Sequence, residues 1–170
     1  RSLLTKNEDL HAPADGTFGE IDYVYDNAGN VSQMTDANGN VVNYTYDDVN
    51  RVLTENYTGA AGTEITYTYD TCTSGKGRLC SVVTTDVTTA YTYDDRGNIA
   101  TETRTIDGDA FTTTFTYDQQ NNLTSIVYPD STDVDYTYNT GGLLETVTYD
   151  SQNLVTDIDY APTLQPSYRE

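Results

Sequence analysis

The sequence predicts an all-β fold in which tandem antiparallel β-hairpins form one curved, spiralling sheet. Three observations predict it. A Tyr-x-Tyr-Asp block recurs at a nearly constant period, turn residues follow one another about every 10–12 residues, and strand-forming residues dominate the composition. The chain has 170 residues with 16 Tyr, 3 Phe and no Trp, and Thr alternates with Tyr in most blocks. Tyr and Thr both favour strands, so the composition indicates sheet rather than helix.

Six copies of the block run along the chain. Each has an aromatic residue, a variable residue, Tyr and Asp, then usually Gly or Asn three residues later and a Val, Ile or Leu. The turn acids, replaced by Asn in the sixth copy, stand at 26, 47, 70, 94, 118 and 139, in steps of 21, 23, 24, 24 and 21 residues. The motif positions that we expect to build the repeats are Tyr23, Tyr25, Asp26, Gly29, Tyr44, Tyr46, Asp47, Asn50, Tyr67, Tyr69, Asp70, Gly77, Tyr91, Tyr93, Asp94, Gly97, Tyr117, Asp118, Asn121, Tyr136, Tyr138, Asn139 and Gly142.

Each block predicts a strand, a turn and a return strand. Because side chains alternate across a strand, the two rings share one face and the residue between them points to the other. The Asp can accept hydrogen bonds from the turn backbone, and the Gly or Asn tolerates a positive φ. This order is typical of a type I turn followed by a left-handed residue that forms a bulge. Half-period copies at 36–41 and 150–154 predict a second turn in each repeat.

The repeat divides the chain into three parts. We expect the array to span residues 17–160, with about six repeats and roughly twelve to fourteen strands. Residues 1–16 carry no repeat and contain Pro13 and Gly16, so we interpret them as a leader, a linker or an end cap. Residues 161–170 are expected to form a C-terminal tail.

Charge excludes several classes of partner. The formal net charge is −19 and the isoelectric point is near 4.1. Nucleic-acid phosphates and anionic membrane surfaces would be repelled by such a chain. No stretch approaches the ~20 apolar residues of a membrane helix. We therefore expect neither nucleic-acid binding nor membrane insertion.

The candidate chemical sites have structural interpretations. The loops at Asp26 and Asp36 resemble calcium loops but lack the distal Glu of an EF-hand, and turn capping explains the same residues. His11 is the one histidine and has no partner for a triad or a metal site. We predict no catalytic residues, no metal, no cofactor and no enzymatic activity.

The two cysteines leave two alternatives open. Cys72 and Cys80 lie eight residues apart around a Gly-rich segment. They can form a local bridge across a hairpin loop in an oxidising compartment, or they can remain free thiols. The spacing does not match a CxxC metal or redox motif.

The blocks resemble the YD repeats of the RHS family. The matching residues include 44–47 with 50–52, and 91–94 with 97–99, and the fit extends over roughly 17–160. The family includes bacterial polymorphic toxins, shell-forming subunits of insecticidal toxin complexes, cell-wall RHS proteins and animal teneurins. The resemblance implies repeats that spiral into a hollow β-shell around a C-terminal toxic domain, or that form the body of an adhesion protein. The autocleaving core of the family has no matching Asp-Pro-x-Gly-type segment here, and the chain is too short for a full cocoon.

The resemblance implies a structural role. We expect a wall segment of a secreted or bacterial cell-surface RHS-type protein, which encloses or displays a toxin or another C-terminal domain. Its partners would be the remainder of the larger chain and, through unpaired sheet edges, further copies of itself. The alternative is a carbohydrate-binding or adhesion module, because stripes of Tyr can stack on sugar rings.

Overall fold

The structure, a computed structural model, describes residues 3–8, 19–59, 64–156 and 158–160. Its 14 strands form one antiparallel sheet in which the spatial order follows the chain order from β1 to β14. The predicted all-β hairpin array is therefore confirmed. The strands are β1 (Lys6–Glu8), β2 (Glu20–Tyr25), β3 (Val31–Thr35), β4 (Val41–Tyr46), β5 (Val52–Thr58), β6 (Ile65–Tyr69), β7 (Leu79–Val83), β8 (Val87–Tyr93), β9 (Ile99–Ile106), β10 (Asp109–Tyr117), β11 (Leu123–Val127), β12 (Asp133–Tyr138), β13 (Leu144–Tyr149) and β14 (Gln152–Val155).

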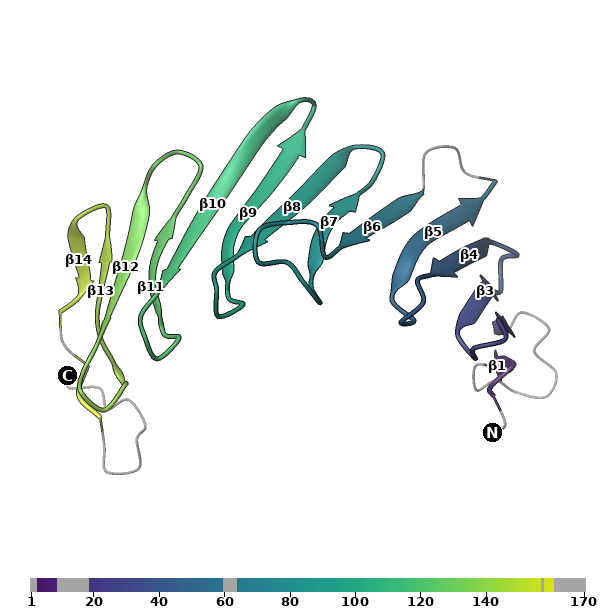
Figure 1. The fold of residues 1–170 in the computed structure, drawn as a ribbon, viewed down its shortest axis with the longest axis horizontal. Coiled ribbons are helices and arrows are strands. Elements are labelled where there is room, and N and C mark those ends of the chain that lie inside the picture. The colour runs from purple at the N-terminus through teal and green to yellow at the C-terminus, as the bar shows by residue number, and fades with distance from the viewer. Residues whose placement is uncertain (1–2, 9–18, 60–63, 157, 161–170) are drawn as a thin grey trace.

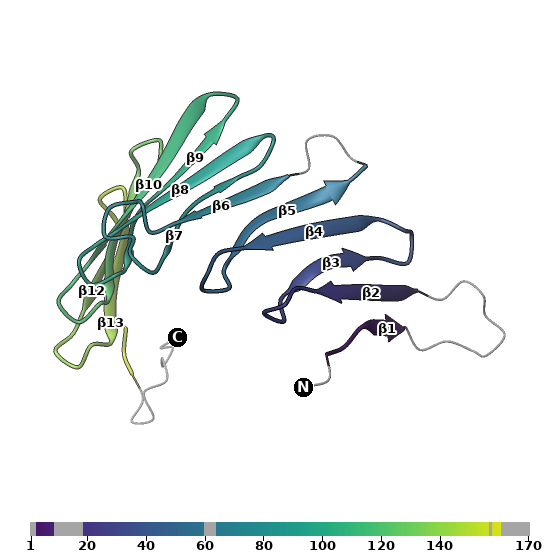
Figure 2. The same cartoon turned by 45° about the vertical axis from the view of Figure 1, so that its right-hand side comes forward.

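The sheet bends into an open arch (Figures 1 and 2). β1 and β14 lie at opposite ends of it and do not meet, so the sheet is not closed. The turns that follow the Tyr-x-Tyr blocks lie along the inner edge of the arch, and the other turns lie along its outer edge (Figure 1). The turns that contain the motif Asp or Asn therefore all lie on the inner edge of the arch.

Each hairpin formed by a block contains a β-bulge. In the second repeat Thr45 pairs with Thr54 and Tyr46 pairs with Val52, so Leu53 is the extra residue. The same one-residue shift occurs before the second Tyr of all six blocks. Bulges bend strands and increase their twist, so a bulge in every repeat contributes a regular curvature to the sheet.

The register gives the two faces of the sheet different chemistry. One row across the strands reads Tyr67, Val82, Thr89, Arg104 and Phe111, and we call its side the tyrosine face. The neighbouring row belongs to the other side, the threonine face, and reads Thr68, Ser81, Ala90, Thr103 and Thr112. Cross-strand Thr hydroxyls bond to each other on that face, at 2.7 Å for Thr45–Thr54, Thr92–Thr101 and Thr137–Thr146.

No second layer covers the sheet among the described residues. The buried hydrophobic side chains there are Val42 and Cys80, each 4% exposed, while the motif tyrosines are half-buried against their neighbours. A folded domain normally buries one face against another layer. Here each strand is stabilised mainly by the strands beside it, as in other repeat proteins.

The segment 1–16, which carries no repeat motif, contributes the first strand. Lys6 of β1 pairs with Asp22 of β2, and the Lys6 ammonium lies 2.7 Å from the Glu20 carboxylate. Pro13 and Gly16 of the expected leader, His11, and the expected tail at 161–170 lie outside the described residues.

Candidate functional site

The candidate functional surface is the inner edge of the arch, which we call the turn rim. It consists of the turns that begin at Asp26, Asp47, Asp70, Asp94, Asp118 and Asn139. Five of the six predicted motif copies place their Asp or Asn in the same geometry, and the third differs.

The fourth turn shows this geometry. One carboxylate oxygen of Asp94 accepts hydrogen bonds from the backbone N–H of Arg96 at 2.9 Å and of Asn98 at 2.8 Å. The other oxygen accepts one from the Asn98 side chain at 3.0 Å, and Gly97, with a φ of 91°, donates its N–H to the Asp94 carbonyl at 3.0 Å. The Asn98 side chain and then the backbone donors stabilise the charged carboxylate, so the pKa of Asp94 lies below its usual value.

The same capping accounts for the loops that resemble calcium sites. Asp36 accepts from the backbone N–H groups of Asn38 and Asn40 at 2.9 and 2.8 Å, and from the Asn40 side chain at 2.7 Å. Asp26 has the equivalent bonds. Among the described residues, no group of three or more His, Cys, Asp and Glu side chains could hold a metal ion. The geometry of these aspartates is that of turn caps.

Five contacts between neighbouring repeats join a tyrosine hydroxyl to a main-chain carbonyl. The Tyr46 hydroxyl crosses from β4 to β3 and donates to the Val31 carbonyl at 2.7 Å. Val31 is the first residue of the preceding return strand, so this bond joins the rim ends of two repeats. We call these contacts the tyrosine junctions; their donor and acceptor pairs are Tyr25–Leu4, Tyr46–Val31, Tyr93–Leu79, Tyr138–Leu123 and Tyr160–Leu144.

At two places where no tyrosine junction forms, arginine joins the repeats, and we call these contacts the arginine junctions. Arg51 binds Asp47 of its own turn at 2.7 Å and Asp70 of the next turn at 2.6 Å, and its guanidinium lies 4.3 Å from the Tyr69 ring centre. At the second, Arg96 donates to the carbonyls of Tyr117 and Asp118. In the described chain, the hydroxyls of Tyr69 and Tyr117 make no bond to the preceding return strand.

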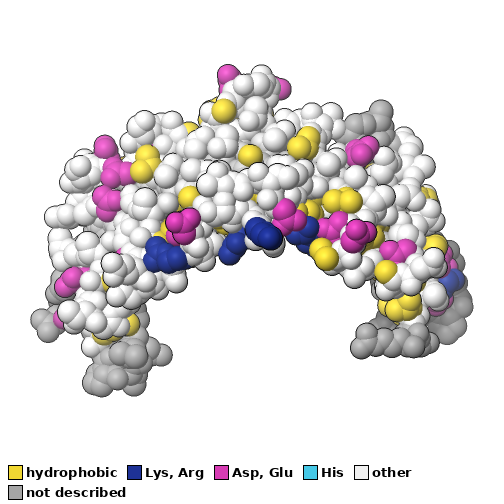
Figure 3. Space-filling view, viewed as in Figure 1, with side chains coloured by type: hydrophobic (Ala, Val, Ile, Leu, Met, Phe, Trp, Pro, Cys, Tyr) yellow, Lys and Arg dark blue, Asp and Glu magenta, His cyan; other side chains and the backbone are white. Residues whose placement is uncertain are grey.

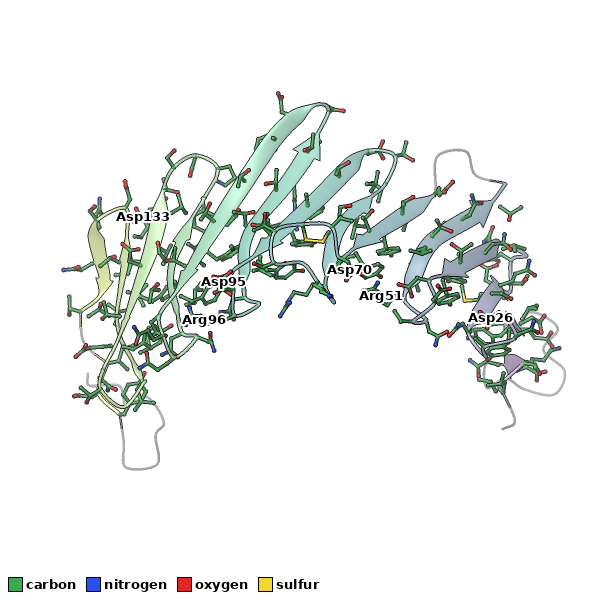
Figure 4. All side chains as sticks on the ribbon, viewed as in Figure 1. Asp26, Arg51, Asp70, Asp95, Arg96 and Asp133 are labelled. Carbon is green, nitrogen blue, oxygen red and sulfur yellow. A yellow bond between two sulfur atoms is a disulfide. The ribbon has the colours of Figure 1, made fainter. Side chains whose placement is uncertain are left out.

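The arginine junctions concentrate positive charge in an acidic molecule. Four of the 8 Lys and Arg residues lie in the second to fourth turns, and Figure 3 shows basic side chains gathered in the hollow of the arch. Figure 4 shows Arg51 and Asp70 side by side on this edge. The hydrogen bond to Arg51 is the main cause that lowers the pKa of Asp70, and Asp70 and then Asp47 raise the pKa of Arg51.

The third turn departs from the pattern. Asp70 itself has a φ of 70°, and the loop that follows is closed by a disulfide between Cys72 and Cys80 with an S–S distance of 2.08 Å. The sequence alone allows either a bridge or two free thiols at this pair. Cys80 is the bulge residue of its hairpin, because Thr68 pairs with Ser81 and Tyr69 pairs with Leu79.

The structure brings the predicted motif residues into rows, but the contacts between rows were not anticipated. The acceptors of the tyrosine junctions are main-chain carbonyls, which no side-chain pattern marks. Among the Arg residues of the turns, Arg51 forms ion pairs with two aspartates, Asp47 and Asp70. Inside the array, each acceptor is the carbonyl of a Val or Leu that follows the preceding turn, but this regularity identifies the acceptor only once the register between repeats is known.

Comparison with known proteins agrees with this geometry. A family model described as teneurin YD-shell matches residues 25–154. The chain belongs to this family. The YD/RHS resemblance of the sequence is thereby confirmed, and the segment is part of a structural β-shell. No curated protein sequence matches the chain.

Solved structures show the same YD-shell fold. The TcdB2-TccC3 complex without its hypervariable C-terminal region has a TM-score of 0.75 at 15% identity, over 87% of this chain and 9% of that one. The TcdB2-TccC3-TEV structure gives 0.56 at 17% identity, over 86% and 10%. A mutant Tc holotoxin pore of Photorhabdus luminescens gives 0.55 at 17% identity, over 86% and 10%. The chain therefore spans about a tenth of the length of these relatives. In the part of the chain that the structure describes, no helix is long and apolar enough to cross a bilayer.

Proposed function

We propose that this YD-shell segment is one stretch of wall in a larger secreted or surface-exposed bacterial chain, and that the wall encloses a further domain of the same chain. The observation that carries the proposal is the continuity of the junctions at the two ends of the array. The Tyr25 hydroxyl donates to the Leu4 carbonyl, and the Tyr160 hydroxyl donates to the Leu144 carbonyl at 2.8 Å.

Through these terminal junctions, the first and last strands take the same positions as strands inside the array. Leu4 occupies the acceptor position that Val31 and Leu123 occupy elsewhere, so β1 acts as the return strand of a repeat. Tyr160 occupies the donor position of a following block. Among the described residues no further strand pairs with the outer edges of β1 and β14, and these edges fit further repeats of the same kind. Exposed edges of this sort also pair with other copies, so we expect self-association when such neighbours are lacking.

The single-layer sheet supports a role as an enclosing wall better than it supports a catalytic role. Its hydrogen bonds and ion pairs join one repeat to the next, and the motif carboxylates are occupied by turn donors. One related structure is described as lacking a hypervariable C-terminal region. By analogy, the wall proposed here would surround a segment that is not part of the array. It would act as a barrier, without catalysis and without a cofactor.

The carbohydrate alternative draws less support from the rim. A hollow between the fifth and sixth turns is lined by Asp118, Asn122, Tyr138 and Asn139, the residue types that sugars contact. However, the Tyr138 hydroxyl donates to the Leu123 carbonyl, and Asp118 accepts from its own turn. Glycan binding would have to displace these bonds.

Protease protection tests enclosure. The native polypeptide that carries this segment is treated with graded proteinase K, and peptides from outside the array are followed by mass spectrometry. The same outer segment expressed alone is the control. We expect the enclosed segment to be cleaved at least about tenfold more slowly in the native chain than alone, because access requires opening of the wall. Equal cleavage rates would contradict enclosure.

A further inference from the structure

The disulfide loop, residues 72–80, is built around its two sulfur atoms. Cys80 is 4% exposed, and Gly75 is buried beside the bridge. A Cβ added to Gly75 would lie 2.2 Å from the sulfur of Cys72 and 2.7 Å from that of Cys80. The Cys72 N–H donates to the Cys80 sulfur at 3.0 Å, and the Gly75 N–H donates to the Cys72 carbonyl at 3.0 Å. The loop therefore takes its shape from the closed bridge.

The same loop reaches across to the fourth repeat. The N–H of Tyr93, at the rim end of β8, donates to the Thr73 carbonyl at 3.1 Å. The Ser74 hydroxyl donates to Asp95 at 3.4 Å. The Arg78 guanidinium lies 5.5 Å from the Tyr93 ring centre. These three contacts place a closed ring of the third repeat over the start of the fourth turn (Figure 4).

Arg78 ties the ring to the neighbouring turn through a glycine. It donates to the carbonyls of Ser74 and Lys76 at 3.4 and 3.1 Å, so its position depends on the loop. Its guanidinium also fills the space beside Gly97, where a Cβ would lie 1.8 Å from Nη2. The fourth turn thus accommodates a side chain held by the disulfide loop of the third.

We infer that the Cys72–Cys80 disulfide is a redox-sensitive clasp that closes the rim between the third and fourth repeats in oxidising surroundings and releases it in the presence of a dithiol. Without the bridge, the strands β7 and β8 keep three register pairs and the Tyr93–Leu79 bond, so the repeats stay joined while the loop opens.

The chemistry is thiol–disulfide exchange. Cys72 is half-buried and Cys80 is buried, so a dithiol thiolate attacks the sulfur of Cys72 and expels the Cys80 thiolate, which takes up a proton. The second thiol of the reagent then attacks the mixed disulfide and releases Cys72 as a thiol. The dithiol leaves as a cyclic disulfide. Two electrons and two protons pass to the protein, and the S–S bond is lost.

Limited trypsin digestion of the chain tests the clasp, because Lys76 and Arg78 lie inside the disulfide loop. The chain is digested with and without dithiothreitol, and the cleavage rates after Lys76 and Arg78 are measured by mass spectrometry. We expect reduction to accelerate both by about tenfold or more, since cleavage requires local opening. Cleavage after Arg104, whose side chain is 60% exposed in β9, is the internal control and should change less than about twofold.

Two variants separate the clasp from a general stabilising bridge. The double variant Cys72→Ser with Cys80→Ser should be cleaved at the fast rate whether or not the dithiol is present. Gly75→Ala keeps both cysteines but cannot fit the closed ring, so it should also be cleaved fast; Gly141→Ala, where the nearest atom is 3.2 Å away, is the matched control and should behave as the parent chain. Equal rates at Lys76 with and without dithiol, or an equal acceleration at Arg104, would overturn the proposal.

Discussion

The tyrosine junctions and the arginine junctions join the same kind of strand pair with different chemistry. At a tyrosine junction a neutral hydroxyl donates to a main-chain carbonyl, as Tyr46 does to Val31 at 2.7 Å. At an arginine junction a charged side chain replaces this bond, as Arg51 does when it spans Asp47 and Asp70. The first type depends on backbone register alone, and the second depends on charges at particular turn positions. The wall thus tolerates a change of junction chemistry while the sheet continues.

The β5–β6 pair shows why the second chemistry is useful. Its ladder has two register pairs, against three for β3–β4 and six for β9–β10. Side chains supplement this short ladder, because the Tyr67 hydroxyl donates to Glu55 at 2.7 Å and Arg51 crosses the rim end. The two strands also splay apart in Figure 2. In the β5–β6 pair, polar side-chain bridges therefore add to a short backbone ladder.

Removal of the disulfide should have the largest effect on stability. Cys72→Ser with Cys80→Ser opens a ring of nine residues, counted from 72 to 80. Loop-closure entropy predicts a loss of about 2–3 kcal/mol in the free energy of unfolding. Urea unfolding followed by circular dichroism measures it. An unchanged free energy of unfolding would mean that the disulfide adds no stability beyond that of the Tyr93–Leu79 junction.

Hydroxyl deletion should separate the two junction types. Tyr46→Phe leaves the Val31 carbonyl without its donor, so we expect a loss of about 0.5–1.5 kcal/mol. Tyr69→Phe is the matched control at an arginine junction, and its loss should stay below about 0.5 kcal/mol. Thermal unfolding of both variants under one set of conditions makes the comparison. Equal losses of stability in Tyr46→Phe and Tyr69→Phe would contradict the assignment of a hydroxyl bond to Tyr46 and not to Tyr69.

The arginine junction should respond to salt. Arg51→Met keeps much of the aliphatic stem and removes both ion pairs, and its Tm should fall by about 1–3 °C at low salt. The difference should shrink at 1 M NaCl, because screening weakens exposed ion pairs. Tyr46→Phe should show the same Tm difference at both salt concentrations. A salt-independent effect of Arg51→Met would assign its role to packing.

Titration should separate the junctions in opposite pH ranges. Asp70 has a lowered pKa, so its stabilisation is complete above the ordinary Asp pKa and is lost as the pH falls through the lowered value. Burial first, and then Asp26, raise the pKa of Tyr46, so its hydroxyl bond persists up to the ordinary Tyr pKa and is lost above the raised one. The Tm difference of Arg51→Met should therefore shrink in acid, and that of Tyr46→Phe should shrink in alkali.

Tyr67 and Asp133 have shifted pKa values that do not belong to either junction type as described above. The pKa of Tyr67 is raised to about 12 by burial and by its bond to Glu55, although Tyr67 lies beside an arginine junction. Burial and then the nearby Asp135 raise the pKa of Asp133, so its protonation favours folding in acid, opposite to the turn aspartates. Asp133 lies away from the rim in Figure 4. The pH-dependent stability contributions of Tyr67 and Asp133 should be the same in both rim variants. They therefore cancel when the Tm values of the variants are compared.

The sequence predicted what depends on neighbours along the chain. Alternation placed the Tyr rings on one face, and the order from Asp26 to Gly29 predicted a turn in which Gly29 has a φ of 92°. It could not predict contacts that need the register between repeats. The acceptor of Tyr46 is a carbonyl 15 residues earlier, and β1 has no block to mark it as a repeat strand. Cys80 became a bridge partner because the bulge falls on it, which the hairpin fixes only once it is folded.

We propose that this segment is a stretch of continuous wall in a longer chain that also carries a domain without repeats. The most direct measurement is the intact mass of the native polypeptide, taken from cells and from culture medium, with sequencing of both ends. We predict a product several times longer than 170 residues, with further YD repeats around this segment and an unrelated C-terminal domain. A native product close to this length would contradict enclosure by a single chain.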